Sequence, residues 1–395
     1  MPKHPIRFGL QSGQQLVEWN ELKDLWRNAD SWGYDSLWTF DHFYPIFVPD
    51  PTGPCLEGWT TLTALSQQTK RARIGAMVNG NTYRNPCITA KMAATLDQVS
   101  DGRLNLGIGA GWFELEHRSF GIDFKTIPGR LQALDESLQI IKGMFEQEKT
   151  TLHGRHYNVT DAVCNPRPLQ KPHPPIMIGG QGQKVLLKIV AKHADMWNVP
   201  GASAERYAEL LKVIERHGDT VGRDTDQIEK TIMMGLCYRA PAEREKAALA
   251  RVTAMSGASP EQARRQIMIG SREECLATIE RYLKVGVTHF IFTLPRPFFM
   301  DEVQRFAEEV IPAVRASYRA VITMQSAASA WATSKGAAIR ANAPESRSRS
   351  SSDNPRAISA LLRRRNPGVE ARKPESNKRW GRVCAASKVR SPRPE

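Results

Sequence analysis

Asp41 and His42 form the most suggestive pair of titratable residues in the sequence. They come directly after the apolar run 36–40, which has the composition of a short β-strand. An imidazole changes its protonation state near neutral pH, so at the carboxyl end of a strand it could donate or accept a proton in a reaction. An Asp–His pair also occurs as a purely structural hydrogen bond, and the pair alone does not decide between the two.

A second candidate segment, LNLGIGAGWFELEH at 104–117, contains Gly107, Gly109 and Gly111. Glycine lets the backbone approach a ligand closely, and these glycines lie where a predicted strand ends. The segment is not the dinucleotide-binding fingerprint, because its G-x-G-x-G run is followed by Trp112 and Phe113 rather than by the spacing that opens a helix. Tight packing of a strand against a helix explains the glycines equally well.

A third segment, PPIMIGGQGQK at 174–184, places Gly179, Gly180 and Gly182 between a predicted strand and a predicted helix. Amides exposed at a helix N-terminus bind anions, so this turn could hold a phosphate without a charged side chain. An ordinary βα turn needs one glycine rather than three, which favours the phosphate site. The small polar run 79–82 could likewise face a flat ligand, although a plain turn fits as well.

The sequence lacks the motifs of several other enzyme classes. It has no G-x-S-x-G elbow, Walker loop or HExxH, and its six cysteines form no zinc-binding pair. Hydrolase, nucleotidase and zinc-enzyme functions therefore lose support, and no metal site is expected. Scattered cysteines, no apolar run long enough for a bilayer helix and no signal peptide predict a soluble cytoplasmic protein with reduced thiols.

The elements that must position these residues alternate along residues 1–318. Short apolar runs predict eight strands, and the stretches between them have helical spacing. The predicted strands are 7–11, 36–40, 73–78, 104–109, 176–179, 196–199, 231–238 and 289–294. Eight βα units in this length predict an α/β fold, a (β/α)8 TIM barrel with insertion segments; the alternative is a doubly wound open sheet.

Two segments interrupt the pattern. Prolines and glycine in the longer one, 150–175, predict a loop or short hairpin over the barrel rim. The shorter one, DHFYPIFVPDPTGPCLEG at 41–58, follows the second strand. We expect both to form walls of a pocket, because segments after strands lie at the catalytic face of a barrel.

The net charge of +14 is concentrated at the C-terminal end of the chain. Residues 319–395 contain 17 Lys and Arg against 5 Asp and Glu, which leaves a net charge of only +2 for residues 1–318. The Arg-, Ser-, Pro- and Ala-rich composition of 319–395 predicts a disordered tail beside the barrel of 1–318. The tail could grip nucleic-acid phosphates, but its unpatterned composition favours a solvated tail with no nucleic-acid partner.

In combination these segments resemble the luciferase-like monooxygenase superfamily, and within it the coenzyme F420-dependent oxidoreductases. The resemblance is carried by DSLWTFDHF (35–43), LEGWTTLTALSQQTKRARIG (56–75), the run from Asn81 to His117, GRHYNV with NPRPLQKPHPPIMIGGQGQK (154–184), and HADMWN (193–198). It covers about residues 5–316. It implies an insertion-bearing barrel that holds a flavin or deazaflavin at its carboxyl face, and by family habit a homodimer.

The resemblance also implies roles for individual residues. Asp41 and His42 would border the ring system, with His42 as catalytic acid or base, and 78–80 would form a bulge behind it, often with a non-prolyl cis bond. Glycines 109 and 111 would pass close to the ring or ribityl chain, and Gly179 and Gly180 would take the phosphate. The cofactor-binding residues so implied are Asp41, Val78, Asn79, Gly80, Gly109, Ala110, Gly111, Gly179 and Gly180. Trp112 stands where the related sugar-phosphate enzymes have a glutamate, which departs from their pattern.

The expected activity is therefore hydride transfer between coenzyme F420 and a small organic substrate, with His42 exchanging the accompanying proton. An FMN-dependent monooxygenase of the same superfamily is the alternative, since flavin and deazaflavin differ at one ring atom. Two further functional classes remain as alternatives: a barrel without catalytic activity, and a nucleic-acid-binding protein that acts through its basic tail.

Overall fold

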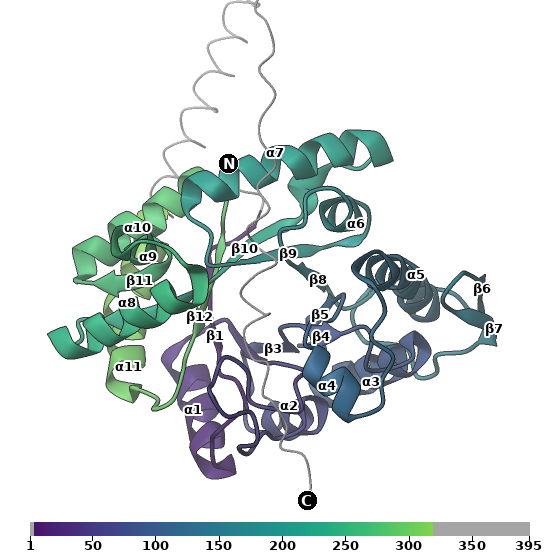
Figure 1. Cartoon of the computed structure of the whole chain (residues 1–395), viewed down its shortest axis with the longest axis horizontal. Coiled ribbons are helices and arrows are strands. Elements are labelled where there is room, and N and C mark those ends of the chain that lie inside the picture. Colours follow the sequence, from purple (N-terminus) through teal and green to yellow (C-terminus); the bar gives the residue numbers. More distant parts are fainter. Residues whose placement is uncertain (1–3, 319–395) are drawn as a thin grey trace, which may run out of the picture. The chain divides into compact units, whose positions relative to one another are not determined.

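The computed structural model describes residues 4–318, and within this range the fold is a (β/α)8 barrel (Figure 1). Parallel strands follow one another around the sheet in the order β3-β2-β1-β12-β10-β9-β8-β5-β4, with β3 and β4 forming two halves of one barrel position. The strands are β1 (Arg7–Gln11), β2 (Ser36–Thr39), β3 (Arg73–Ala76), β4 (Asn79–Gly80), β5 (Leu106–Gly109), β8 (Ile176–Gly179), β9 (Met196–Pro200), β10 (Glu229–Tyr238) and β12 (His289–Thr293). The predicted barrel is confirmed, and each of the predicted strands is present within two residues at either end.

Pairing of the first and last strands closes the barrel. β1 pairs in parallel with both β2 and β12, and β3 reaches the start of β5 through the bridge between Ile74 and Leu104. An open doubly wound sheet would leave two free edges, so that alternative is wrong.

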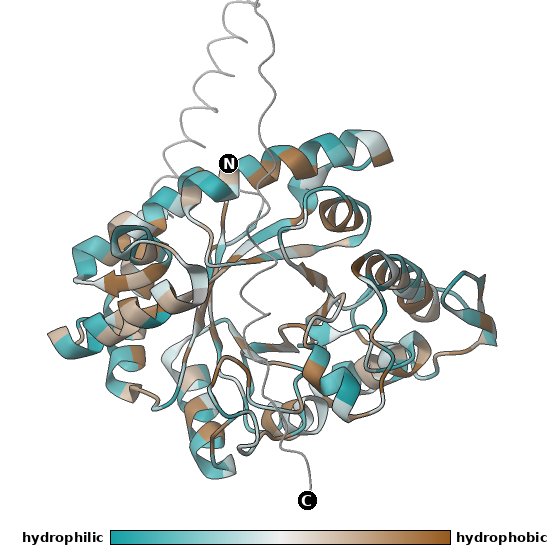
Figure 2. Ribbon diagram, viewed as in Figure 1, coloured by the Kyte–Doolittle hydropathy of each residue, from teal (hydrophilic) through white to brown (hydrophobic). Residues whose placement is uncertain are grey.

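The helices surround the strands and cover them with their apolar faces. They are α1 (Trp19–Trp32), α2 (Gly58–Ser66), α3 (Pro86–Val99), α4 (Glu114–Ser119), α5 (Ile127–Glu146), α6 (Leu186–His193), α7 (Ala204–Val221), α8 (Ala242–Ser256), α9 (Pro260–Arg264), α10 (Arg272–Lys284) and α11 (Met300–Glu309). In α1, for example, Leu22, Leu25, Trp26 and Ala29 are buried at helical spacing. Figure 2 shows hydrophilic and hydrophobic stretches alternating around this ring of helices. None of the described helices is long and apolar enough to cross a membrane.

A methionine-rich layer fills the inside of the barrel. Met77, Met177 and Met196 pack there with Trp38 and Ile291. Flexible thioether side chains fill irregular gaps well, which suits the tapering interior of a closed sheet. The layer gives the carboxyl end of the barrel an apolar floor.

The second half of β10 leaves the barrel path and pairs with β11 (Ile267–Gly270), a strand missing from the predicted set. Residues 267–270 read IMIG, as do residues 176–179 of β8. The same four-residue sequence therefore forms a barrel strand at 176–179 and a strand outside the barrel path at 267–270.

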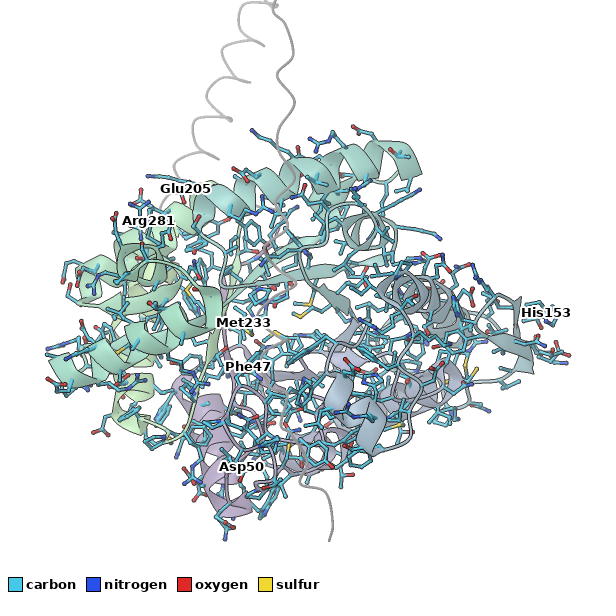
Figure 3. The ribbon with its side chains drawn as sticks, in the orientation of Figure 1. Phe47, Asp50, His153, Glu205, Met233 and Arg281 are labelled. Carbon is cyan, nitrogen blue, oxygen red and sulfur yellow. The ribbon has the colours of Figure 1, made fainter. Side chains whose placement is uncertain are left out.

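The segment 150–175 contains the predicted hairpin, and Asn81, directly after β4, donates to the Tyr157 hydroxyl at its tip. The hairpin pairs β6 (Thr150–His153) with β7 (Asn158–Ala162), and the Glu136 carboxylate of α5 accepts hydrogen bonds from backbone amides 155–157 at its tip. The chain then returns to the start of β5, where Gln170 binds Asp97 and the carbonyl oxygen of Leu104. The segment thus spans from the loop after β4, at Tyr157, to the start of β5, at Gln170, while Figure 3 shows His153 at the outer edge of the described part. The predicted tail, 319–395, lies outside the described residues.

Candidate active site

His42 and Glu116 form the centre of the site at the carboxyl ends of the strands. His42 follows β2, and Glu116 lies on the short helix α4 that follows β5. His42 Nδ1 lies 2.9 Å from Glu116 Oε2, and His42 is 8% exposed. The neighbouring loops of a closed barrel converge at this end, which brings together two residues separated by 74 positions.

Glu116 is held as a carboxylate by several donors. Its Oε1 accepts the backbone N–H groups of Phe43 and Tyr44, and its Oε2 also accepts the Tyr83 hydroxyl. Burial by itself would raise the pKa of Glu116, but the hydrogen bond and charge of His42, then Tyr83 and the Tyr44 amide, bring the pKa below its ordinary value. A carboxylate only accepts hydrogen bonds, so Nδ1 of His42 carries the donated proton and Nε2 is the nitrogen left for chemistry.

Asp41 does not contact its neighbour His42 through a hydrogen bond. Its Oδ2 accepts the N–H of Gly80 at 3.0 Å and Arg84 Nη1 at 2.7 Å, while Arg84 Nη2 lies 2.9 Å from Glu57 Oε1. Burial raises the pKa of Asp41, and Arg84 opposes that rise. Asp41 thus ties the loop after β2 to β4, and the structural interpretation of an Asp41–His42 hydrogen bond is wrong.

The break between β3 and β4 forms a bulge, as the resemblance implies. The peptide bond between Met77 and Val78 is cis. Val78 lies against two of the predicted glycines, since a Cβ atom on Gly109 would be 2.9 Å from Val78 Cγ2 and one on Gly179 would be 3.5 Å from Val78 Cγ1. Asn79 donates to the carbonyl oxygen of Gly107. The structure therefore brings 78–80 together with the ends of β5 and β8.

The loop after β5 passes along the same opening. Ala110 is partly exposed, and Gly111 has a φ of +76°, which side chains rarely adopt. A Cβ atom on Gly111 would lie 2.4 Å from Thr82 Oγ1, in the loop after β4. Glycine at 111 is thus required both by the backbone and by the approach of Thr82.

The glycine turn after β8 has a φ of +126° at Gly180. The N–H of Gly180 donates to the carbonyl oxygen of Asn198 at 3.0 Å, and the carbonyl of Gly180 accepts from Trp197 Nε1 at 2.9 Å. The Gly180 amide is therefore occupied and does not fit the predicted role of phosphate donor. The next amides, those of Gln181 and Gly182, make no hydrogen bond to another residue in the described part of the chain.

No set of three or more His, Cys, Asp or Glu side chains gathers within residues 4–318 as metal binding would need. The groups that face the opening are instead an imidazole, buried carboxylates and glycine turns. This combination suits proton exchange beside a large, flat, phosphorylated ligand.

A sequence model of the luciferase-like monooxygenase family matches residues 3–266, two thirds of the chain. The chain belongs to the luciferase-like monooxygenase family.

Curated relatives of this luciferase-like protein include two F420-dependent glucose-6-phosphate dehydrogenases. The protein from Kineococcus radiotolerans is 28% identical and that from Microbacterium testaceum 29% identical, each over 335 residues that cover 79% of this chain and 98% of the relative. Among solved structures, an F420-dependent secondary alcohol dehydrogenase bound to an F420–acetone adduct has a TM-score of 0.70 at 21% identity, covering 79% of this chain and 100% of that one. The F420-dependent tetrahydromethanopterin reductase of Methanopyrus kandleri has a TM-score of 0.66 at 20% identity, with the same coverage.

Glu116 is the residue of this luciferase-like site that sequence reasoning missed. It lies four residues beyond Trp112, on α4. The segment FELEH, with two glutamates directly after the aromatic pair, was the signal that could have indicated it. Sequence reasoning also missed the aromatic neighbours of His42. The ring centroid of His42 lies 5.2 Å from that of Phe40, 5.5 Å from that of Trp112 and 5.9 Å from that of Phe113.

Proposed function

We propose that this protein is a coenzyme F420-dependent oxidoreductase that transfers a hydride between the deazaflavin and a small organic molecule. The observation that carries the proposal is the His42 imidazole at the carboxyl end of the barrel, with Nδ1 fixed by a buried carboxylate and Nε2 left for proton exchange. The named F420-dependent activities of the relatives support the choice of coenzyme.

The residues around the opening fit such a coenzyme. Asp41 Oδ1 and Asn79 Oδ1 are buried and have no hydrogen-bond partner among the described residues. Unpaired buried acceptors are costly, and a ligand with ring N–H groups would satisfy them. The free amides of Gln181 and Gly182 would hold the phosphate of the coenzyme. Gly109 and Gly111 have no side chains, so the coenzyme could approach the protein backbone closely there.

When bound, the deazaflavin supplies a two-electron hydride donor or acceptor at its C5 atom. His42 then moves a proton between Nε2 and the oxygen atom of the substrate. Glu116 holds the Nδ1 proton and stabilises the imidazolium form with its negative charge. The rings of Phe40, Trp112 and Phe113 cover His42 and limit the access of water to it.

The decisive experiment is a titration of the full chain with coenzyme F420 and with FMN, followed by spectra and fluorescence. We expect F420 to bind at least about tenfold more tightly than FMN, and the reduced complex to consume no molecular oxygen. Tighter binding of FMN together with oxygen consumption would assign the protein to the FMN-dependent monooxygenases instead.

A glycine variant controls this titration. Gly180→Val would place a side chain 2.5 Å from Leu186 Cδ2 in the phosphate turn, and we expect it to abolish coenzyme binding. Gly222→Ala is the matched control, because Gly222 also has a positive φ, +69°, but caps α7 with nothing within 4 Å of an added Cβ atom. Loss of binding in both variants would trace the effect to backbone strain rather than to the site.

We also propose that the protein acts in the cytoplasm as a homodimer without a nucleic-acid partner, as a barrel of 1–318 followed by a disordered tail. Five free cysteines among the described residues agree with a reducing compartment. The homodimer rests on the family resemblance, and sedimentation of the full chain tests it. Hydrogen exchange of 319–395 tests the tail.

A further inference from the structure

We infer that the substrate is an uncharged, flat, apolar ketone, or the alcohol that it yields, bound against the ring of Trp112 and not a sugar phosphate. This inference rests on the proposed function and deepens it by naming the substrate class. Three features of the opening carry it: an exposed aromatic wall, a strained residue that maintains this wall, and arginines that are already paired.

The aromatic wall consists of Trp112 and Phe47. Their rings stack with centroids 5.5 Å apart and an interplanar angle of 14°, yet Trp112 remains 48% and Phe47 61% exposed. Trp112 also meets the His42 ring edge-on. In Figure 3, Phe47 and Met233 both project near the middle of the ring of strands. An apolar ligand would cover this surface while its reacting atom lies beside the imidazole, and removal of aromatic area from water favours such binding.

Phe47 is held in an unfavourable backbone conformation. Its φ is +57°, a left-handed value that bulky residues rarely adopt. Strain of this kind persists at sites where the surroundings impose it, and here it presents an aromatic ring to solvent beside Trp112.

Three arginines that follow strands at this end are engaged in ion pairs, and Arg130, beside the loop after β5, donates to the carbonyl oxygens of Gly111 and Lys125. Arg84 pairs with Asp41 and Glu57, as described above, Arg239 lies 3.0 Å from Glu309 Oε2, and Arg296 lies 2.8 Å from Glu21 Oε2. A phosphate dianion would have to break the buried Arg84–Asp41 pair to gain that cation, which costs free energy, whereas the Arg239 and Arg296 pairs are partly exposed and cost less to break. The exposed Lys184 belongs to the glycine turn and thus to the side of the coenzyme phosphate.

The reaction balances with the groups named. In ketone reduction the carbonyl carbon gains a hydride from the reduced deazaflavin, which is oxidised by two electrons. The carbonyl oxygen gains the proton from Nε2 of His42, and the product is a secondary alcohol. His42 is left neutral and regains its proton from solvent, while oxidation of the alcohol reverses each transfer.

Calorimetry of the F420-loaded full chain tests the inference with two probes, 2-acetonaphthone and glucose 6-phosphate. We expect the ketone to bind and the sugar phosphate not to bind. Trp112→Ala should weaken ketone binding roughly tenfold, since an aromatic partner is lost, while the affinity for F420 stays unchanged. Leu169→Ala is the matched control, because Leu169 is also exposed, at 49%, but precedes the return of the chain to the start of β5.

Binding or preferred turnover of glucose 6-phosphate would overturn the inference. So would a Trp112→Ala variant that loses affinity for F420 and keeps its affinity for the ketone, because the ring would then serve the coenzyme. If the wild-type chain does not bind F420, the proposed function fails separately. The same two probes titrated into the unloaded chain then decide the substrate class.

Discussion

Two histidines of this protein lie beside glutamates at opposite ends of the barrel. At the carboxyl end, His42 Nδ1 lies 2.9 Å from Glu116; at the amino end, His289 Nδ1 lies 3.3 Å from Glu229 Oε1, without the geometry of a hydrogen bond. For both glutamates burial acts to raise the pKa, but the neighbouring histidine acts against it strongly enough that both pKa values lie below the ordinary range. The histidine lowers the pKa of the glutamate in both pairs, although Glu229 also has the Arg7 guanidinium 2.8 Å from its Oε2.

The pairs differ in their second ring nitrogen. Nε2 of His289 lies 2.7 Å from Ser36 Oγ, which also accepts from Trp38 Nε1, and His289 is fully buried. Nε2 of His42 has no such partner among the described residues and lies at the opening. A His–Glu pair therefore indicates a catalytic group where the fold leaves the other ring nitrogen accessible to a ligand, as at His42.

The largest expected effect is on turnover at the carboxyl end. His42→Ala should lower kcat roughly 10²- to 10⁴-fold, because the proton donor is lost, and should leave F420 affinity unchanged. Steady-state assays with a coenzyme titration alongside measure both. Unchanged turnover would remove His42 from the mechanism and erase the contrast with His289.

The corresponding change at the amino end should affect stability instead. His289→Ala removes the buried hydrogen bond to Ser36, while Glu229 keeps its ion pair with Arg7, so we expect the free energy of unfolding to fall by about 1–3 kcal/mol. Turnover of the folded fraction should stay within about twofold of wild type, since the site is distant. Urea denaturation measures the first and an active-site titration the second; a large loss of kcat in folded protein would contradict the division of roles.

Glu116→Gln sharpens the role of the carboxylate as a positioning residue. The amide keeps the shape but loses the charge that stabilises imidazolium, so kcat for ketone reduction should fall by roughly tenfold and KM should change little. The acidic and basic limbs of the pH profile distinguish this from a structural defect: activity should shift to lower pH. Glu116→Asp should restore part of the activity, and equal losses in both variants with no shift in pH would indicate mere packing.

The smallest expected effect concerns pH and stability at the amino end. A lowered pKa of Glu229 means that the folded state favours its carboxylate. The Glu229 carboxylate therefore stabilises the folded state at pH values above its pKa in the unfolded chain, about 4.3. This stabilisation is lost as the pH falls through the lower pKa of the folded state. It amounts to about 1.4 kcal/mol for each pH unit by which folding lowers the pKa. Denaturation of wild type and Glu229→Gln between neutral and acidic pH should therefore show a difference that shrinks on acidification. A constant difference would show that Glu229 does not titrate with folding.

The sequence by itself determined the alternation of strands and helices and therefore the barrel, because apolar spacing is a local property of each segment. It also singled out the glycine runs that contain Gly111 and Gly180, whose positive φ angles the structure then showed. It did not distinguish the two IMIG runs of β8 and β11, because their partners, not their residues, decide where they pair.

Tertiary structure alone decided the partners of the site. It placed Glu116 rather than the adjacent Asp41 beside His42, turned Asp41 toward Gly80 and Arg84, and occupied the amide of Gly180 with Asn198. Each of these outcomes depends on how loops from different strands meet when the barrel closes, and such contacts between distant residues leave no periodic mark in one sequence.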